Sequence, residues 1–277
     1  MSRIDGCTAL ITGASAGIGR EFARQLAHTA AAIVLVARRR DRLEELRTEL
    51  TQINPDLRVH ILDTDLSDEN AISQIFDYLD TENISIDFLI NNAGLGDYGL
   101  FATSDPERVR QMLTVNITAL TLLTRRCLPA MIQRNRGAIL NVSSTAGFLP
   151  LGGFAVYAAT KAFATSFSEG IRSELRGSGV TVTALCPGPV DTEFSDLARR
   201  SPTSGPKSSA RFMRVPVETV VQVSLAAVEH DKPIVIPGLF MKVAMLLARL
   251  MPAPALRLVS RASASRLGVH HSSLPVD

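Results

Sequence analysis

The 277-residue sequence contains no tryptophan, and aromatic residues make up only 5% of it. Proteins that bind single-stranded nucleic acid stack bases on aromatic rings and hold the phosphate backbone with an excess of basic side chains. Here 29 Lys and Arg residues stand against 27 Asp and Glu residues, a net charge of +2. Both features disfavour nucleic acid as a partner, and we expect no such role.

Cysteine is also scarce. Cys7, Cys127 and Cys186 are far apart, and each lies in apolar sequence, so they form neither a disulfide framework nor a C-x-x-C pair. We therefore expect no metal and a reducing, cytoplasmic location. The sequence lacks any run of the roughly 18 to 20 apolar residues that a transmembrane helix requires. Its first residues, which include Arg3 and Asp5, do not resemble a secretion signal.

Apolar side chains, in contrast, are plentiful at 46% of the sequence, against 20% charged. Short β-branched apolar runs alternate with longer segments in which apolar residues recur every three or four positions. These patterns predict strands over residues 7–12, 33–37, 59–62, 88–91, 138–143, 180–186 and 232–238, and helices over residues 20–28, 41–53, 69–79, 106–134, 157–176 and 216–229. Strands that are apolar on both faces need burial between two helical layers. The predicted fold class is therefore α/β, a doubly wound parallel sheet of about seven strands with helices on both faces.

Two segments depart from this alternation. Residues 194–216 become rich in Ser, Pro and basic side chains, which predicts a lid rather than a stable element. No repeat interrupts the earlier sequence, so residues 1–238 are predicted to form one domain. Residues 239–277 form a C-terminal extension.

A glycine-rich turn, T-G-A-S-A-G-I-G at residues 12–19, lies between the first predicted strand and the first helix. In this position a dinucleotide pyrophosphate would meet the unpaired N–H groups of the helix. Gly13 allows the tight turn, Gly17 lets the backbone approach phosphate, and Gly19 lets the helix pack closely on the strand. An isolated glycine match often marks only a tight turn, but the strand-turn-helix context favours a dinucleotide site.

Three arginines stand about twenty residues further on, where a site for NAD normally presents an acidic side chain to the ribose 2′-hydroxyl. A guanidinium pairs with the 2′-phosphate of NADP through charge-assisted hydrogen bonds. Arg38 and Arg39 thus predict NADP(H) rather than NAD(H). The alternative is an exposed helix face balanced by glutamates, which explains Arg40 well and Arg38 poorly.

Tyr157 and Lys161 are four residues apart on a predicted helix, so both lie on one face. A neighbouring ammonium favours the phenolate and should bring the tyrosine pKa toward neutrality. The Ser143-Ser144 pair closes the fifth strand at the carboxyl edge of the sheet, where α/β proteins bind ligands. One of these hydroxyls would bind a substrate carbonyl, and the other would cap a turn.

These motifs, with Asp65-Leu66, N-N-A-G at residues 91–94, Asn116 and C-P-G-P-V-D-T at residues 186–192, resemble the short-chain dehydrogenase/reductase superfamily. These are NAD(P)-dependent oxidoreductases of Rossmann type. The likeness spans roughly residues 5–195 and, more loosely, continues to about 238.

The resemblance implies roles for these residues. The family serine lies thirteen residues before the tyrosine, which selects Ser144 over Ser143. Tyr157 would be the general acid/base, Ser144 would orient the carbonyl, Lys161 would hold the nicotinamide ribose and lower the tyrosine pKa, and Asn116 would complete a proton relay. The expected cofactor contacts are Gly13, Ser15, Gly17, Ile18, Gly19, Arg38, Arg39, Asp65, Leu66, Asn92, Ala93, Gly94, Tyr157, Lys161, Pro187, Gly188, Val190 and Thr192.

The implied activity is hydride transfer between NADP(H) and a carbonyl or secondary alcohol. Residues 95–101, 148–154 and 194–214 are apolar and would form the cleft walls, which indicates a lipophilic ketone or aldehyde. The family likeness also implies a homo-dimer or homo-tetramer built on the long helices. The alternative is a catalytically silent module that senses NADP(H) or binds a protein.

The extension carries five basic residues and one acidic residue, a charge of +4 against −2 for the rest of the chain. Phe240, Val243, Leu246, Leu247 and Leu250 form one stripe of a helical wheel, and Lys242 and Arg249 lie off it. We expect the stripe to dock on the domain, to cover the cleft or to join subunits. Peripheral membrane contact through residues 239–266 is the alternative.

Overall fold

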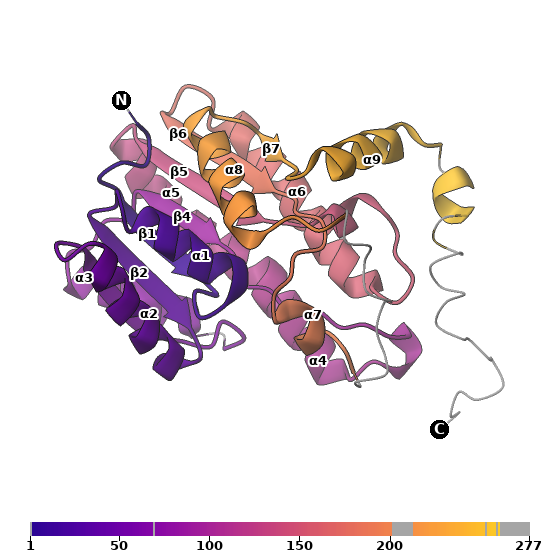
Figure 1. Ribbon diagram of the computed structural model, residues 1–277, viewed down its shortest axis with the longest axis horizontal. Coiled ribbons are helices and arrows are strands. Elements are labelled where there is room, and N and C mark those ends of the chain that lie inside the picture. The colour runs from indigo at the N-terminus through magenta and orange to yellow at the C-terminus, as the bar shows by residue number, and fades with distance from the viewer. Residues whose placement is uncertain (1, 69, 201–212, 253, 259, 261–277) are drawn as a thin grey trace.

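The computed structural model describes residues 2–68, 70–200, 213–252, 254–258 and 260. At its centre seven strands form one parallel sheet in the order β3-β2-β1-β4-β5-β6-β7 (Figure 1). The strands are β1 (Thr8–Thr12), β2 (Ala32–Ala37), β3 (Arg58–Asp63), β4 (Phe88–Asn91), β5 (Gly137–Val142), β6 (Val180–Leu185) and β7 (Ile234–Val235). This confirms the predicted fold class.

Helices cover both faces of the sheet. They are α1 (Gly17–Leu26), α2 (Arg40–Ile53), α3 (Ala71–Thr81), α4 (Pro106–Leu113), α5 (Leu120–Gln133), α6 (Ala155–Glu174), α7 (Phe194–Leu197), α8 (Val217–Glu229) and α9 (Leu239–Leu250). One core cluster contains side chains of α1, α2 and α8, and a second contains side chains of α3, α5 and α6. The sheet therefore lies between two helical layers.

Strand β2 shows why a central strand of this sheet is apolar along its whole length. Ile33 and Leu35 belong to the first core cluster, whereas Val34 and Val36 belong to the second. Successive side chains of a strand point to opposite faces, so burial on both faces requires an uninterrupted apolar run.

The strand order reverses at β1. From β1 the chain adds β2 and β3 on one side, and then returns to place β4 on the other side. Ligands of open α/β sheets bind outside the carboxyl ends of the strands at such a reversal. In this sheet the glycine turn follows β1, the serine pair follows β5, and both lie with the end of β4 at this carboxyl edge.

Two predicted elements differ from those observed. The helix expected over residues 106–134 is interrupted by a π-helical segment, Thr114–Ala119, between α4 and α5. Single-turn π-helical segments of this kind are rare inside α-helices, and the apolar pattern does not predict one. The last strand covers only Ile234–Val235 because Pro233 and Pro237 flank it, and proline offers no N–H to the ladder.

The predicted lid, residues 194–216, falls partly outside the described residues, which omit 201–212. Its described start includes α7 and is tied to the segment after β4. The Arg200 guanidinium donates to both carboxylate oxygens of Asp97, at 2.8 and 2.6 Å, and to the carbonyl of Leu100 at 2.9 Å. These contacts hold two of the predicted cleft walls against each other.

The C-terminal helix α9 docks on the domain with a face other than the predicted one. Met241, Met245 and Ala248 are buried against a cluster that includes Phe148 and Leu149. The predicted stripe points away from the domain, and Leu246 and Leu250 are 59% and 74% exposed. The expectation that this stripe docks on the domain is therefore wrong, because the methionines fill the contact instead.

Among the described helices, none combines the length and the apolarity that crossing a membrane requires. Within the same residues, no group of side chains has the composition of a metal site.

Candidate active site

The glycine-rich turn connects β1 to α1. Gly17, the first residue of α1, has φ +54°, a conformation that favours glycine. A Cβ on Gly19 would lie 2.4 Å from the Gly13 carbonyl oxygen, so only glycine fits this close approach. The cap residue Ala16 makes no side-chain hydrogen bond to the helix. The turn thus presents a helix N-terminus without a side-chain cap, which suits a dinucleotide phosphate.

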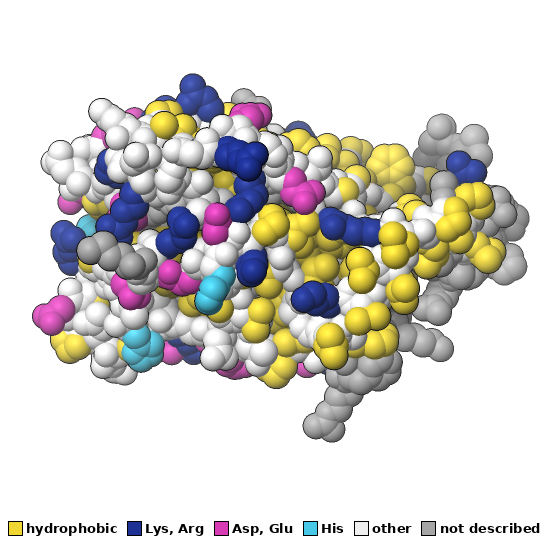
Figure 2. Space-filling view, turned by 90° about the horizontal axis from the view of Figure 1, so that it is seen from above, with side chains coloured by type: hydrophobic (Ala, Val, Ile, Leu, Met, Phe, Trp, Pro, Cys, Tyr) yellow, Lys and Arg dark blue, Asp and Glu magenta, His cyan; other side chains and the backbone are white. Residues whose placement is uncertain are grey.

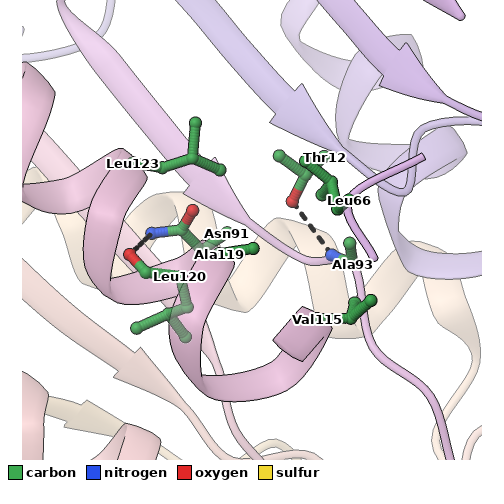
Figure 3. A pocket seen from close by; sticks show the side chains of 8 residues that line it. All are labelled: Thr12, Leu66, Asn91, Ala93, Val115, Ala119, Leu120 and Leu123. Carbon is green, nitrogen blue, oxygen red and sulfur yellow. Dashed lines mark hydrogen bonds between the residues drawn. The ribbon is translucent and has the colours of Figure 1, made fainter. Parts of the chain in front are cut away.

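Asn92 and Thr12 join the turn to the end of β4. The Asn92 side-chain amide donates to the carbonyls of Thr12, at 2.8 Å, and of Gly13, at 3.2 Å. The Thr12 hydroxyl accepts from the backbone N–H of Asn92 at 3.0 Å. It also accepts from the N–H of Ala93 at 3.0 Å, the contact drawn in Figure 3. The sequence indicates Thr12 only as the first residue of the glycine-rich motif. Its hydroxyl holds the two strand ends together.

A small hollow lies beneath this junction (Figure 3). Thr12, Leu66, Asn91, Ala93, Val115, Ala119, Leu120 and Leu123 line it. Leu66 is buried in the second core cluster, so its side chain is a core group rather than a surface contact. Asp65 remains at the surface, where its carboxylate lies 3.7 Å from the Arg38 guanidinium.

The three arginines after β2 have different partners. Arg39 donates to the Ser15 hydroxyl at 3.3 and 3.2 Å, which brings its guanidinium over the glycine turn. It also pairs with Glu193 at 3.0 Å. Arg40 lies on α2 and pairs with Asp63 at 3.1 Å and Glu44 at 3.6 Å, as the helix-face interpretation expects.

The segment after β6 contacts both the glycine turn and the turn after β5. A Cβ on Gly17 would lie 3.1 Å from the Thr192 methyl group, so the two expected cofactor contacts face each other. The Thr145 N–H donates to the Pro187 carbonyl at 2.9 Å. Ile18 and Val190 are partly buried and pack on the first core cluster.

The geometry separates the two serines. The Ser143 hydroxyl is buried and donates to the Lys161 carbonyl at 2.6 Å. Ser144 begins the 3₁₀ turn Thr145–Phe148, where its hydroxyl accepts from the Ala146 N–H at 3.1 Å. The same hydroxyl hydrogen-bonds with Tyr157. Ser144 therefore both caps the turn and faces the phenol.

Lys161 lies beneath Tyr157, one helical turn further along α6. Its ammonium donates to the Val142 carbonyl at 2.7 Å and lies 5.8 Å from the centre of the Tyr157 ring. A Cβ on Gly94 would be 3.3 Å from this nitrogen. The Lys161 side chain thus joins the end of β5 to the loop after β4.

Asn116 lies in the π-helical segment and is buried. Its amide donates to the Leu95 carbonyl at 2.9 Å and to the Thr160 hydroxyl at 3.0 Å, and its carbonyl accepts from the Leu95 N–H at 2.8 Å. Both amide hydrogens are used in these contacts. The side chain therefore positions the loop beside Lys161, a role that the implied proton relay did not anticipate.

Burial changes the acid-base properties of this pair. It raises the pKa of Tyr157 to about 12, although the hydrogen bond with Ser144 acts in the opposite direction. It also lowers the pKa of Lys161 to about 8. The expected lowering of the Tyr157 pKa by Lys161 does not occur in this structure, because the ammonium binds the Val142 carbonyl instead of the phenol.

Aromatic rings surround Tyr157. The ring centres of Phe154 and Phe194 lie 5.6 and 5.4 Å from that of Tyr157, and Tyr98 lies 4.8 Å from Phe154. The sequence placed these residues in three separate cleft walls and did not predict their contact. Together they form an apolar surface around the phenol.

We expect the shifted pKa of Lys161 to make stability depend on pH. Because the ammonium is disfavoured when buried, the unfolded chain binds more protons between about pH 8 and 10.5, so stability rises over this window. At pH 7 the Lys161→Met variant should be more stable than expected from the lost hydrogen bond. Its advantage should shrink by about 3 kcal/mol at most as the pH rises to 10.5. Urea unfolding of both proteins across this range measures the difference, and a constant difference would contradict the assignment.

The arrangement is that of a Rossmann-type dinucleotide fold with a Ser-Tyr-Lys cluster beside its glycine turn. The sequence profile of the short chain dehydrogenase family matches residues 7–202. The chain belongs to this family of oxidoreductases.

Three similar proteins illustrate the match. NADP-dependent 3-hydroxy acid dehydrogenase YdfG of Escherichia coli K12 is 38% identical over 191 residues, which cover 68% of this chain and 75% of that protein. A short-chain dehydrogenase from Sphingobium yanoikuyae in complex with NADPH is 33% identical, with a TM-score of 0.77 over 88% of this chain and 93% of that one. The bulky-bulky ketone specific alcohol dehydrogenase from Comamonas testosteroni is 27% identical, with a TM-score of 0.72 over 98% and 97%.

Proposed function

We propose that this protein transfers hydride between NADP(H) and a carbonyl or secondary alcohol, and that it reduces a lipophilic ketone or aldehyde. The observation that carries this proposal is the convergence of Ser144, Tyr157 and Lys161 at the carboxyl end of β5. The cluster adjoins the loop after β4, which Asn92 ties to the glycine turn.

The chain's own residues supply the proton and the orientation. The Ser144 hydroxyl donates a hydrogen bond to the substrate carbonyl oxygen, and the Tyr157 phenol delivers its proton to the same oxygen as negative charge develops there. The raised pKa of Tyr157 keeps this proton in place at neutral pH. Asn116 holds the loop after β4 beside the phenol, and Lys161 would hold the cofactor ribose there. Bound NADPH supplies the hydride.

The arginines favour NADP(H) over NAD(H). Arg38 follows β2 directly and has one long ion pair, to Asp65, so its guanidinium is available to a 2′-phosphate. Arg39 already contacts Ser15 on the glycine turn. The NADP dependence of YdfG and the bound NADPH of the Sphingobium enzyme support the same preference.

The rings around Tyr157 support a lipophilic substrate. Tyr98, Phe154 and Phe194 offer mostly carbon atoms to a ligand that approaches the phenol. A small charged substrate would lose its hydration there without gaining partners. The name of the Comamonas enzyme, which specifies bulky ketones, agrees with this proposal.

A catalytically silent NADP(H) sensor is the second candidate. It would explain the glycine turn and the arginines equally well. It would not explain why a serine hydroxyl and a buried lysine are held beside a tyrosine. The complete cluster therefore favours the enzyme.

To test the proposal, a panel of carbonyl compounds is assayed with NADPH, and the oxidation of NADPH is followed by the loss of its absorbance. The panel would contain an aryl alkyl ketone, a steroid ketone, a 3-oxoacyl thioester and a small polar aldehyde. We expect kcat/KM for the best lipophilic compound to exceed that of the polar aldehyde by about 100-fold, the effect of one or two buried hydrocarbon contacts. Binding of NADPH without turnover of any compound would favour the sensor instead.

We also propose that the protein forms a homo-dimer or homo-tetramer. Leu122 and Ile132 on α5 are 42% and 45% exposed, which suits helix packing between subunits. A measured mass of one chain in light scattering would contradict this.

A further inference from the structure

The outer face of α9 exposes a continuous apolar surface. Leu239, Val243, Leu246, Leu247 and Leu250 make up this surface, which we term the α9 outer face. Figure 2 shows apolar side chains gathered at the end of the molecule where α9 lies, with basic side chains among them. Single exposed leucines are common on protein surfaces, but a continuous row of this kind usually marks a contact site.

This surface is distinct from the face that docks the helix. With about 3.6 residues per turn, Met241, Met245 and Ala248 lie on the side of the helix opposite the α9 outer face. These three residues attach the helix to the domain. The Arg249 guanidinium adds a contact, with its Cζ 4.8 Å from the centre of the Phe148 ring. The outer leucines therefore add nothing to the docking of α9.

The charge of this region is of one sign. Between residues 239 and 276 the sequence has five basic residues and no acidic residue. Lys242 is exposed and lies at the edge of the α9 outer face, next to Val243. Arg257 is exposed a few residues after the end of the helix. An apolar stripe with a basic border is the pattern of helices that lie in the interface of an anionic bilayer.

The charge also argues against a second copy of this chain as the partner of the α9 outer face. In a two-fold dimer the same patch meets itself, so Lys242 and Arg257 would approach their own copies without acidic partners. An anionic lipid surface, in contrast, gains about 1 kcal/mol of attraction for each basic side chain near it.

We propose that the α9 outer face binds an anionic lipid bilayer, with the helix lying along the surface. This would bring the candidate active site close to the lipid. Met241 contacts Gly188, since a Cβ there would lie 2.9 Å from the Met241 Cγ, and α9 packs on the turn that Ser144 begins. A lipophilic substrate would then reach the cleft from the bilayer, a consequence that rests on the proposed function.

Vesicle co-sedimentation of the full chain tests the proposal. We expect binding to phosphatidylcholine vesicles that contain phosphatidylglycerol, at least about tenfold weaker binding to pure phosphatidylcholine, and loss of binding at high salt. Leu246→Glu with Leu250→Glu should weaken binding by more than about 100-fold, because it removes two inserted side chains and adds two negative charges. Lys242→Glu should weaken it by about tenfold.

The matched control is Val223→Glu on α8, an exposed apolar residue outside α9 and outside the helices proposed to join subunits, which should leave binding unchanged. Turnover of a water-soluble carbonyl compound by each variant shows whether the enzyme remains folded, and its absence in all of them would count against the proposed function alone. Equal binding to neutral and anionic vesicles, or none to either, would overturn the proposal. A third result would also overturn it: no vesicle binding by the unchanged protein, and a lower oligomeric mass for the Leu246→Glu, Leu250→Glu variant. That result would identify a second copy of the chain as the occupant of the α9 outer face.

Discussion

Replacing Tyr157 with phenylalanine should lower kcat by about 10² to 10⁴-fold, the usual contribution of general acid catalysis, while NADPH binding remains within a few-fold. The change removes one hydroxyl and keeps the ring, so the contacts with Phe154 and Phe194 persist. Because the protein has no tryptophan, the fluorescence of bound NADPH can be followed with little background from the protein. Turnover and binding can thus be measured on one preparation.

Tyr98→Phe is the matched control. Tyr98 is a buried member of the same aromatic group and contacts Phe154, but it is not adjacent to Ser144 or Lys161 in the contacts described above. Removing its hydroxyl should leave kcat nearly unchanged. Full activity of the Tyr157→Phe protein would refute the assignment of the proton donor. A simultaneous loss of NADPH binding would indicate a structural role instead.

Replacing Arg38 with aspartate should raise the KM for NADPH by about 100-fold and change that for NADH by only a few-fold. The substitution removes a charge-assisted pair with the 2′-phosphate and adds a negative charge in its place. A carboxylate at this position also matches the hydrogen bond that an unphosphorylated ribose offers. Steady-state assays with both coenzymes and one ketone measure the two constants.

Arg40→Asp serves as the control for charge alone. Arg40 lies two residues away but pairs with Asp63 and Glu44, so its replacement should affect both coenzymes equally and weakly. Equal effects of Arg38→Asp on NADPH and NADH would remove the argument for NADP(H). Arg39 would then be the residue to examine, since it contacts Ser15 and also forms an ion pair with Glu193.

Glu193 illustrates an interaction that the sequence concealed. It binds both Arg39, at 3.0 Å, and Arg42, at 2.5 Å, and these hydrogen bonds lower its pKa. The carboxylate and the arginines are about 150 residues apart in the chain. Nothing in the local pattern around residue 193 indicates this pairing. The Glu193 carboxylate therefore binds the Arg39 guanidinium, to which a phosphate group of the cofactor would also bind.

The strands and the glycine turn were predictable because their signals are local. β2 is buried along its entire length, and an unbroken apolar run of that length has few other uses. The turn at residues 12–19 depends on glycine at fixed positions, and Gly19 has no space for a side chain. The two departures lie at the π-helical segment, a backbone feature that apolar runs do not mark, and at β7, which flanking prolines shorten.

The candidate site was only partly predictable. The four-residue spacing of Tyr157 and Lys161 gave their shared helix face, but not the raised pKa of Tyr157, because burial depends on rings from other segments. The choice between Ser143 and Ser144 rested on a family spacing. The fold supplies a physical reason for it, since the Ser143 hydroxyl is used by the Lys161 carbonyl.

From the sequence alone follow the layered α/β fold, the glycine-rich turn between β1 and α1, and the shared helix face of Tyr157 and Lys161, because each depends on residues close together in the chain. Tertiary structure decided which side of α9 faces the domain. The helical wheel offers both the methionine side and the leucine side as apolar, and only the shape of the surface near Phe148 and Leu149 selects the methionines. It likewise decided the partners of Asn116 and the rings around Tyr157, since these contacts join segments whose separation in the chain carries no local signal.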